Sequence, residues 1–233
     1  MLTEDFQVKT EFETIIGTVN YGESRLPPTV ISLHGAGPSN KDTTKYIAEY
    51  LSKKDRSVIR FDFSGHGEST GLMRESSLSK RLNEVKCVLD HFHVNYPITV
   101  IGTSMGGHIA SLLTALFEVQ CLILFCPATY DRKASDVPFT DNFTEIIRKP
   151  NSYQNSDVFD ILKKFKGKAL TIIGNNDEII PEAVIADYNS SLKNSELAMF
   201  LRIGDCPHRI HVWLEKNKQA REKMFNAIDL LIG

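Results

Sequence analysis

The sequence lacks several features on which large classes of proteins depend. Its longest apolar run, Cys121–Cys126, has six residues, whereas a membrane-spanning helix needs about 20. Charge of neither sign dominates, since 27 Lys and Arg face 29 Asp and Glu. Because nucleic-acid binding depends on neutralising many phosphates, no nucleic-acid ligand is expected. The N-terminus carries Glu4 and Asp5 where an export signal needs a basic flank, so no such signal is expected.

Cysteine and metal-ligand patterns are equally scarce. The four cysteines contain no CxxC pair: Cys87, Cys121, Cys126 and Cys206. Without an export signal, the pattern is typical of reduced, mostly buried thiols in a cytoplasmic protein. There is also no H-E-x-x-H motif, no Cys/His cluster and no glycine-rich phosphate loop followed by lysine. We therefore expect neither a metal nor any other cofactor.

What the sequence does contain is an alternation of short apolar runs and amphipathic segments. Phe6–Phe12 and Thr14–Tyr21 have the β-branched and aromatic content of a leading strand pair. Six further runs suit strands buried on both faces: Thr29–Leu33, Ser57–Phe63, Ile98–Ile101, Cys121–Phe125, Ala169–Ile173 and Leu197–Ile203. Helices are expected over residues 40–53, 77–92, 105–117, 157–165, 181–192 and 211–231. The alternation predicts a doubly wound α/β fold with a mostly parallel, eight-stranded sheet flanked by helices.

One segment departs from this alternation. Residues 127–155 show no strong period and contain scattered aromatics. Long irregular segments in compact domains are usually functional, so we expect a short lid within a single domain of residues 1–233. Four of its aromatics either line an acyl pocket or form the apolar underside of the lid: Tyr130, Phe139, Phe143 and Tyr153.

The most specific motif is Gly102-Thr-Ser104-Met-Gly106-Gly107. It follows an apolar run and precedes a segment of small apolar residues, which is the strand–turn–helix setting of the G-x-S-x-G nucleophile elbow. Gly102 and Gly106 are expected because a Cβ would clash in so tight a turn. The simpler interpretation of the motif is a turn rich in Gly and Ser that has no catalytic role. The motif predicts that Ser104 is a nucleophile.

A serine hydroxyl is a weak nucleophile and needs a general base, which in this fold follows it in the chain. Three histidines qualify: His108, His208 and His211. His108 is four residues along the same helix and is poorly placed. His208 lies in a loop after the last strand, at the edge where α/β sites form, and is the predicted base. His211, three residues later, stays an alternative.

The base needs an orienting acid, expected after the penultimate strand. Asp177 comes just after Ala169–Ile173 and before the helix that Pro181 opens. The alternatives are Asp205, Glu178 and Asp131. Asp177 is the predicted acid.

Backbone amides near the nucleophile could stabilise an oxyanion. The loop after the third strand reads Leu33-His34-Gly35-Ala36-Gly37, whose glycines allow close approach to a carbonyl oxygen. The predicted donors are the amides of Ala36 and Met105. His34 is expected to fix this loop and to take no part in the chemistry.

Together these motifs resemble the α/β-hydrolase superfamily, in the branch of monoacylglycerol lipases, cinnamoyl and feruloyl esterases and serine aminopeptidase-like hydrolases. The resemblance covers nearly the whole chain and rests on His34-Gly35-Ala36-Gly37, Asp62-Phe-Ser-Gly65-His66-Gly67-Glu-Ser69, Gly102-Thr-Ser104-Met-Gly106-Gly107, Gly174-Asn-Asn-Asp177-Glu-Ile-Ile-Pro181 and His208. It implies a Ser104–Asp177–His208 triad and an oxyanion hole from Ala36 and Met105. It also implies that Asp62, Gly65, His66 and Gly67 shape a loop without direct chemistry.

The expected activity is hydrolysis of small carboxylic esters through an acyl-enzyme on Ser104. A thioester is the nearest alternative substrate, since the acyl-enzyme chemistry is the same. A peptide is less expected, because a short lid offers little room for acids that would hold a substrate amine. The alternative from another class is a catalytically silent hydrolase fold that serves as a binding module.

Overall fold

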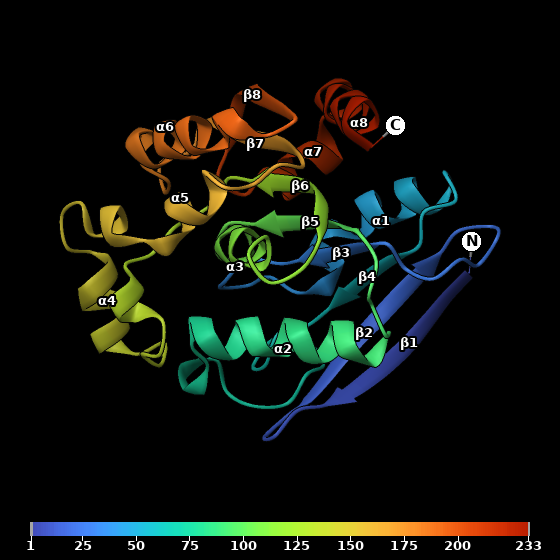
Figure 1. Ribbon diagram of the computed structural model, residues 1–233, viewed down its shortest axis with the longest axis horizontal. Helices are drawn as coiled ribbons and strands as arrows, with labels where there is room; N and C mark the ends of the chain where they lie inside the picture. Colours follow the sequence, from blue (N-terminus) through green and yellow to red (C-terminus); the bar gives the residue numbers. More distant parts are fainter. Residues whose placement is uncertain (1, 233) are drawn as a thin grey trace. The chain divides into compact units, whose positions relative to one another are not determined.

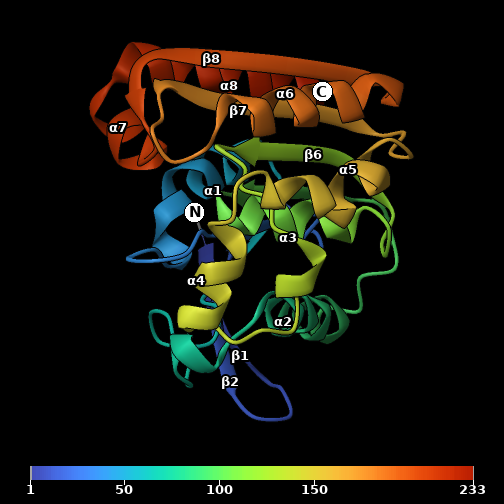
Figure 2. The same ribbon diagram turned by 90° about the vertical axis from the view of Figure 1, so that its left-hand side faces the viewer.

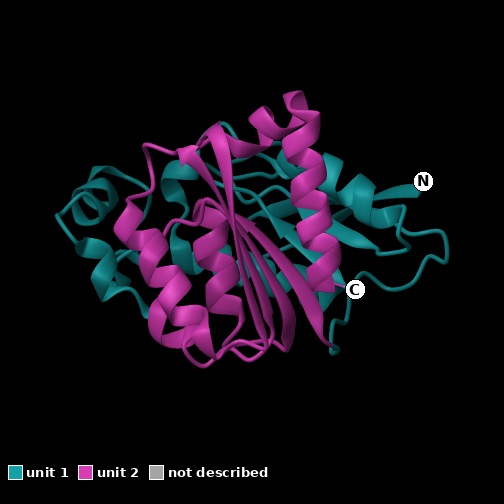
Figure 3. Ribbon diagram, turned by 90° about the horizontal axis from the view of Figure 1, so that it is seen from above, with its two compact units in different colours: residues 1–96, 130–157 teal, residues 97–129, 158–233 magenta. Residues whose placement is uncertain are grey.

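The computed structural model describes residues 2–232, which form two compact units (Figure 3). The first contains residues up to 96 together with 130–157, and the second contains 97–129 together with residues from 158 onward. The boundary at 129/130 falls inside the segment expected to form a lid. The expectation of a single domain with a lid over 127–155 stays a prediction.

The first unit contains four strands in the order β1-β2-β4-β3. β1 (Leu2–Lys9) pairs antiparallel with β2 (Thr14–Tyr21), which confirms the leading strand pair and places it next to β4 (Val58–Phe61). β3 (Val30–Leu33) runs parallel to β4, and every residue of both strands is buried. Complete burial explains why both strands are mostly apolar. Ser32 in β3 and Arg60 in β4 are the buried polar exceptions.

Two helices of the first unit, η1 and α2, begin at side-chain caps. η1 (Lys41–Thr44) begins after Asn40, whose side chain accepts a hydrogen bond from the Asp42 amide, and continues into α1 (Lys45–Ser52). After the short η2 (Met73–Glu75), Ser77 caps α2 (Leu78–His91) by accepting from the Lys80 amide at 3.1 Å. Such caps satisfy amides that have no acceptor within the helix.

A loop built around Asp62 follows β4. The Asp62 carboxylate accepts hydrogen bonds from the amides of Lys41, at 2.6 Å, and Glu68, at 2.9 Å. Gly67 has a φ of 49° and lies so close to this carboxylate that a Cβ would clash with it. Gly65, with a φ of 75°, also adopts a left-handed conformation that favours glycine. The loop therefore depends on its glycines and on one buried acid.

The segment expected to be irregular contains three short helices instead. They are η3 (Arg132–Ala134), α4 (Asp141–Ile147) and η4 (Ser152–Asn155), and α4 is labelled in Figure 2. Asp131 begins η3 by accepting from the Lys133 amide at 2.9 Å. Helices of three to seven residues are too short for an apolar period to become visible in the sequence.

The second unit contains four parallel strands in the order β5-β6-β7-β8. Their bounds are Ile98–Thr103, Val119–Phe125, Lys168–Asn176 and Leu197–Pro207. The units together hold the eight expected strands, mostly parallel and flanked by helices (Figure 1). The predicted α/β class is confirmed.

Helices flank the strands of the second unit on two sides (Figure 3). They are α3 (Met105–Leu113), α5 (Asp157–Leu162, which begins at the unit boundary), α6 (Glu182–Ser191), the short η5 (Leu192–Asn194), α7 (Ile210–Lys216) and α8 (Lys218–Ile232). The prediction of one helix over 211–231 is wrong, because Asn217 separates two helices, α7 and α8. Within residues 2–232, no helix combines the length and apolar character that crossing a membrane requires.

Candidate active site

Ser104 occupies a sharp turn between β5 and α3. It has φ 51° and ψ −115°, a conformation that costs a non-glycine residue about 1–3 kcal/mol. The adjoining chain holds it there, since the Ser104 amide donates to Phe125 O at 2.9 Å and its carbonyl accepts from the Ala128 amide at 3.0 Å. The turn places Ser104 at the carboxyl end of a buried strand.

Two glycines allow this turn to form. A Cβ on Gly102 would lie 2.5 Å from Gly106 O and 2.6 Å from the Ala110 Cβ, which supports the expected role of this glycine. Gly107 had no role assigned from the sequence. Its Cβ would lie 2.9 Å from the Pro127 Cβ. The contact depends on where β6 ends, which no local pattern around Gly107 reveals.

Ser104, His208 and Asp177 form one hydrogen-bonded chain. His208 Nδ1 lies 2.8 Å from Asp177 Oδ2, and His208 Nε2 lies 3.1 Å from Ser104 Oγ. With its hydrogen on Nδ1, the imidazole donates to Asp177 and accepts from the serine hydroxyl. This is the arrangement in which a neutral histidine can take the serine proton.

Parallel pairing of β7 with β8 brings the acid and the histidine together. Their register aligns Asn176 with Pro207, and each strand ends at that residue. Asp177 and His208 are the next residues along the two strands and therefore emerge side by side. The sequence analysis expected each residue directly after a strand end, and the structure brings the two together there. Their catalytic roles stay a prediction.

The Asp177 carboxylate is fixed through both oxygens. Oδ2 contacts His208, and Oδ1 accepts from the amides of Ile179 at 2.9 Å and Ile180 at 3.1 Å. Its side chain is only 6% exposed. Burial raises the pKa of this carboxyl, but the hydrogen bonds from His208 and the two amides outweigh it, so the pKa lies below its ordinary value. Asp177 is therefore ionised at neutral pH.

The two alternative histidines lie elsewhere in the second unit. His211 Nε2 lies 2.7 Å from Thr103 Oγ1, and its ring centroid is 4.6 Å from that of Phe125. His108 is buried in α3. Burial lowers the pKa of each to about 3, so both are neutral at ordinary pH. The histidine that accepts the hydrogen bond from the Ser104 hydroxyl is His208.

Among the candidate acids in the described part of the chain, Asp177 is the one whose carboxylate is hydrogen-bonded to His208. Asp205 is exposed and adopts a φ of 55°, and Glu178 is exposed. Asp131 belongs to the first unit, where it caps η3 and accepts from Asn155 Nδ2 at 3.1 Å.

The predicted oxyanion donors belong to different units. Met105 is the first residue of α3, where amides have no acceptor within the helix. Ala36 follows β3 in the first unit and is half-buried. Two residues before Ala36, His34 Nε2 accepts a hydrogen bond from the Phe63 amide at 3.0 Å. This contact agrees with the expected role of His34 in fixing the loop. The joint role of the two amides stays a prediction.

Three of the four aromatics expected to line a pocket form a cluster in the first unit. The ring of Phe143 lies 4.8 Å from that of Phe139 and 5.7 Å from that of Tyr130. Tyr153, in η4, is half-buried. Their contact with a substrate stays a prediction.

The thiols of Cys126 and Cys206 are buried, and the charge of Asp177 acts on both. Burial raises the pKa of Cys206 to about 12, helped by the Asp177 charge. Burial also raises the pKa of Cys126, with the charge of Asp177 and a hydrogen bond to it acting in the same direction. Ligand atoms of Cys126, Asp177 and His208 lie within 4.8 Å of one another, so this set could hold a metal ion. The raised pKa keeps the Cys126 thiol protonated, which favours a hydrogen bond over metal binding.

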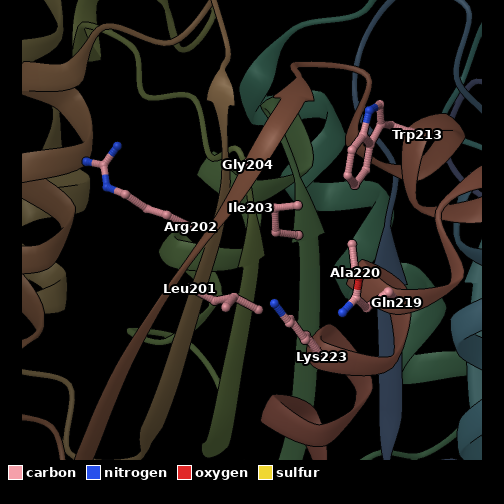
Figure 4. Close-up of a pocket in the computed structure, with 8 residues that line it drawn as sticks. All are labelled: Leu201, Arg202, Ile203, Gly204, Trp213, Gln219, Ala220 and Lys223. Atoms are coloured by element: carbon pink, nitrogen blue, oxygen red, sulfur yellow. The ribbon is translucent and has the colours of Figure 1, made fainter.

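A separate small pocket borders β8. It has a volume of about 170 Å³ and is lined by Leu201, Arg202, Ile203, Gly204, Trp213, Gln219, Ala220 and Lys223 (Figure 4). Ligand pockets usually enclose about 300–1,000 Å³. The pocket contains no member of the Ser104–His208–Asp177 chain and is small for an organic substrate.

One family model matches a continuous part of the chain. Residues 26–152, more than half of the sequence, match the family model described as serine aminopeptidase, S33. The matched range includes Ala36 and Ser104 and ends before Asp177 and His208.

Individual relatives are distant. Over 123 residues the chain is 28% identical to monoacylglycerol lipase ABHD6 of Mus musculus. That match covers 51% of this chain and 36% of the lipase, so the chain spans about a third of this relative's length.

Two solved structures resemble the whole chain. Est1E from Butyrivibrio proteoclasticus, bound to ferulic acid, gives a TM-score of 0.72 at 21% identity and covers 96% of this chain and 99% of its own. Pyrococcus furiosus esterase Pf2001 gives 0.71 at 19% identity and covers 100% and 93%. At these identities the likeness establishes the fold.

Proposed function

The chain belongs to the α/β-hydrolase family described as serine aminopeptidase, S33, and we propose that it is a serine hydrolase of small carboxylic esters. The observation that carries this proposal is the hydrogen-bonded chain from Ser104 Oγ through His208 to Asp177. Relatives named as lipases and esterases support ester substrates.

Acylation begins when Ser104 Oγ attacks the acyl carbon of the ester. His208 Nε2, 3.1 Å away, takes the hydroxyl proton as the bond forms. The imidazole becomes positively charged, and the Asp177 carboxylate stabilises that charge through Nδ1. His208 then gives the proton to the departing alcohol.

The oxyanion of the tetrahedral intermediate needs donors that are already oriented. The Met105 amide, at the start of α3, is one proposed donor and the Ala36 amide is the other. Water then attacks the acyl-enzyme with His208 as its base, and the acid is released. The same steps apply to a thioester.

The test is covalent labelling with a fluorophosphonate probe, followed by a screen of p-nitrophenyl esters and acyl-CoA thioesters. Ser104→Ala is the matched control. Labelling of the native chain and none of Ser104→Ala is expected, with turnover falling by about 10⁴-fold or more in the variant. Folded native protein that neither reacts with the probe nor hydrolyses any ester would instead indicate a binding module.

A further inference from the structure

A second hydrogen bond connects the segments that carry the nucleophile and the base. It joins Thr103, the residue before Ser104, to His211, which follows His208 in the first turn of α7. Thr103 Oγ1 and His211 Nε2 lie 2.7 Å apart, and both side chains are buried. All four residues belong to the second unit. The strand that ends at the nucleophile is therefore tied to the helix that begins beside the base.

The ends of two neighbouring strands hold the His211 ring in place. Thr103 is the last residue of β5 and Phe125 the last of β6, and the parallel register aligns the two. The ring centroids of Phe125 and His211 lie 4.6 Å apart. The Phe125 carbonyl also accepts from the Ser104 amide at 2.9 Å. The residues that contact His211 are therefore the ones next to the strained turn of the nucleophile.

The chain from His208 to His211 is short and internally hydrogen-bonded. The Ile210 amide donates to His208 O at 2.7 Å, and the Trp213 amide donates to Arg209 O at 3.2 Å. Because these bonds leave the segment little backbone freedom, the position of His211 sets that of the His208 backbone. The Asp177 carboxylate orients the imidazole of His208, whereas the first turn of α7 fixes its main chain.

The contact between Thr103 and His211 introduces no charge. Burial lowers the pKa of His211 to about 3, so this imidazole is neutral at ordinary pH. It therefore adds no repulsion when His208 becomes positively charged during acylation. Its contribution to the reaction is geometrical.

We propose that Thr103 and His211 are positioning residues, whose hydrogen bond keeps His208 Nε2 within reach of Ser104 Oγ. The inference rests on the proposed serine hydrolase chemistry. Transfer of the hydroxyl proton needs the two atoms about 2.6–3.2 Å apart, and the observed 3.1 Å lies near the upper limit of that range. A small retreat of His208 is therefore enough to break the bond. The competing explanation is that the pair only packs α7 against the sheet, so that its removal lowers stability and leaves the turnover of the folded chain unchanged.

The test replaces the Thr103 hydroxyl by a methyl group of nearly the same size. Thr103→Val should lower kcat for a p-nitrophenyl ester by about 10-fold, because a misplacement of about 1 Å costs as much as about 100-fold in rate. KM should stay close to its native value, since neither residue is proposed to contact the substrate. Thr103→Ser keeps the hydroxyl and should restore turnover nearly to the native rate. The rate of fluorophosphonate labelling should follow kcat, because both depend on the reactivity of Ser104.

Thr171→Val is the matched control. It is the same substitution in buried strand β7 of the same unit, and Thr171 Oγ1 has no hydrogen-bond partner among the described residues. It should keep the native kcat and labelling rate. Native values of both in folded Thr103→Val would overturn the proposal, and so would equal losses in Thr103→Val and Thr171→Val.

A double-mutant cycle tests the same bond from its other side. His211→Phe removes the ring nitrogens and keeps a ring against Phe125, so it should lower kcat to the extent that Thr103→Val does. The combined variant should lose little more than either single variant, because the two residues act through one contact. Losses that multiply would show independent effects and overturn the proposal. If Thr103→Val does not fold, as judged by urea denaturation, the comparison of His211→Phe with the native chain decides in the same way.

Labelling rates separate this inference from the proposed function. Labelling of the native chain without hydrolysis of any ester would sink ester hydrolysis, and slower labelling of Thr103→Val and His211→Phe would still support the positioning role. Ester hydrolysis by the native chain, with native labelling rates in both variants, would do the reverse.

Discussion

The Asp177 carboxylate is held by hydrogen bonds at both of its oxygens. One oxygen orients His208, and the other is held by two amides. Replacement by an amide would keep the size of the side chain but remove the acceptor that selects the Nδ1–H form of the imidazole. The consequence should appear in turnover, because substrate binding does not need this tautomer.

We therefore predict that Asp177→Asn lowers kcat by about 10⁴-fold, as loss of the orienting acid does in serine proteases. Asp205→Asn is the control, since Asp205 is exposed and close in sequence to His208. Esterase assays with a saturating p-nitrophenyl ester measure both. Near-native turnover in Asp177→Asn, or a comparable loss in Asp205→Asn, would show that the acid has been misassigned.

The sequence places Asp177 and His208 directly after strand ends, but it does not indicate that Arg81 of α2 is buried. The first two follow strand ends, and strand ends are visible as the limits of apolar runs. Arg81 lies in an amphipathic helix, where a charged residue is ordinarily expected on the solvated face. Its burial arises from Phe63 and Phe139, which are 18 and 58 positions away in the chain. Only tertiary packing brings these side chains together.

Among the elements, α3 packs tightly against the chain that follows β6. Gly107 faces Pro127, and a Cβ there would lie 2.9 Å from its Cβ and 3.0 Å from its Cα. The helix cannot retreat easily, because the amide of Ala128 is bonded to the Ser104 carbonyl. A methyl group at Gly107 therefore has to displace the backbone.

We predict that Gly107→Ala lowers the free energy of unfolding by about 1–2 kcal/mol. Overpacking costs about 1–3 kcal/mol, and the better helix propensity of alanine returns at most about 1 kcal/mol. Urea denaturation measures the change. Gly204→Ala is the control, because no atom lies within 4 Å of the added Cβ. Equal stability of Gly107→Ala and the native chain would contradict the close contact.

The helix at the end of the chain shows why element limits are harder to predict than element types. The apolar period continues through 211–231, and Lys216-Asn217-Lys218 contains neither glycine nor proline. The break at Asn217 comes from its backbone, with φ −117° and ψ 84°, and its Nδ2 donates to Trp213 O at 2.7 Å. An asparagine that bonds to its own helix end competes with continued helix, and such competition is decided by packing.

The aromatic cluster of residues 127–155 is expected to contact the acyl chain of the ester. If the rings make this contact, each buried methylene adds about 0.8 kcal/mol to transition-state binding. Phe143→Ala should then reduce the preference for long over short p-nitrophenyl esters and leave the acetate nearly unchanged. Phe12→Ala is the control, since that ring is 76% exposed. A uniform loss for all esters, with a lower melting temperature, would mean that the rings serve only packing.

At the scale of the whole molecule, buried histidines determine how the fold responds to acid. Burial lowers the pKa of both His108 and His211 to about 3, whereas an exposed histidine titrates near pH ~6.5. Between these values the unfolded chain binds protons that the native chain excludes. Stability therefore rises with pH across this window and is lost as the pH falls. The lowered pKa of Asp177 acts in the same direction below pH ~4.

We predict that the free energy of unfolding falls between pH 7 and pH 4.5, and that His108 and His211 each contribute about 2–3 kcal/mol of the fall. Urea denaturation at the two pH values measures it. In His211→Gln the difference between the two pH values should shrink by that amount, even if the loss of the Thr103 contact lowers stability at both. The exposed His91→Gln should keep the native difference. An unchanged pH response in His211→Gln and in His108→Gln would mean that other groups, such as His34, whose pKa burial also lowers, cause the sensitivity to acid.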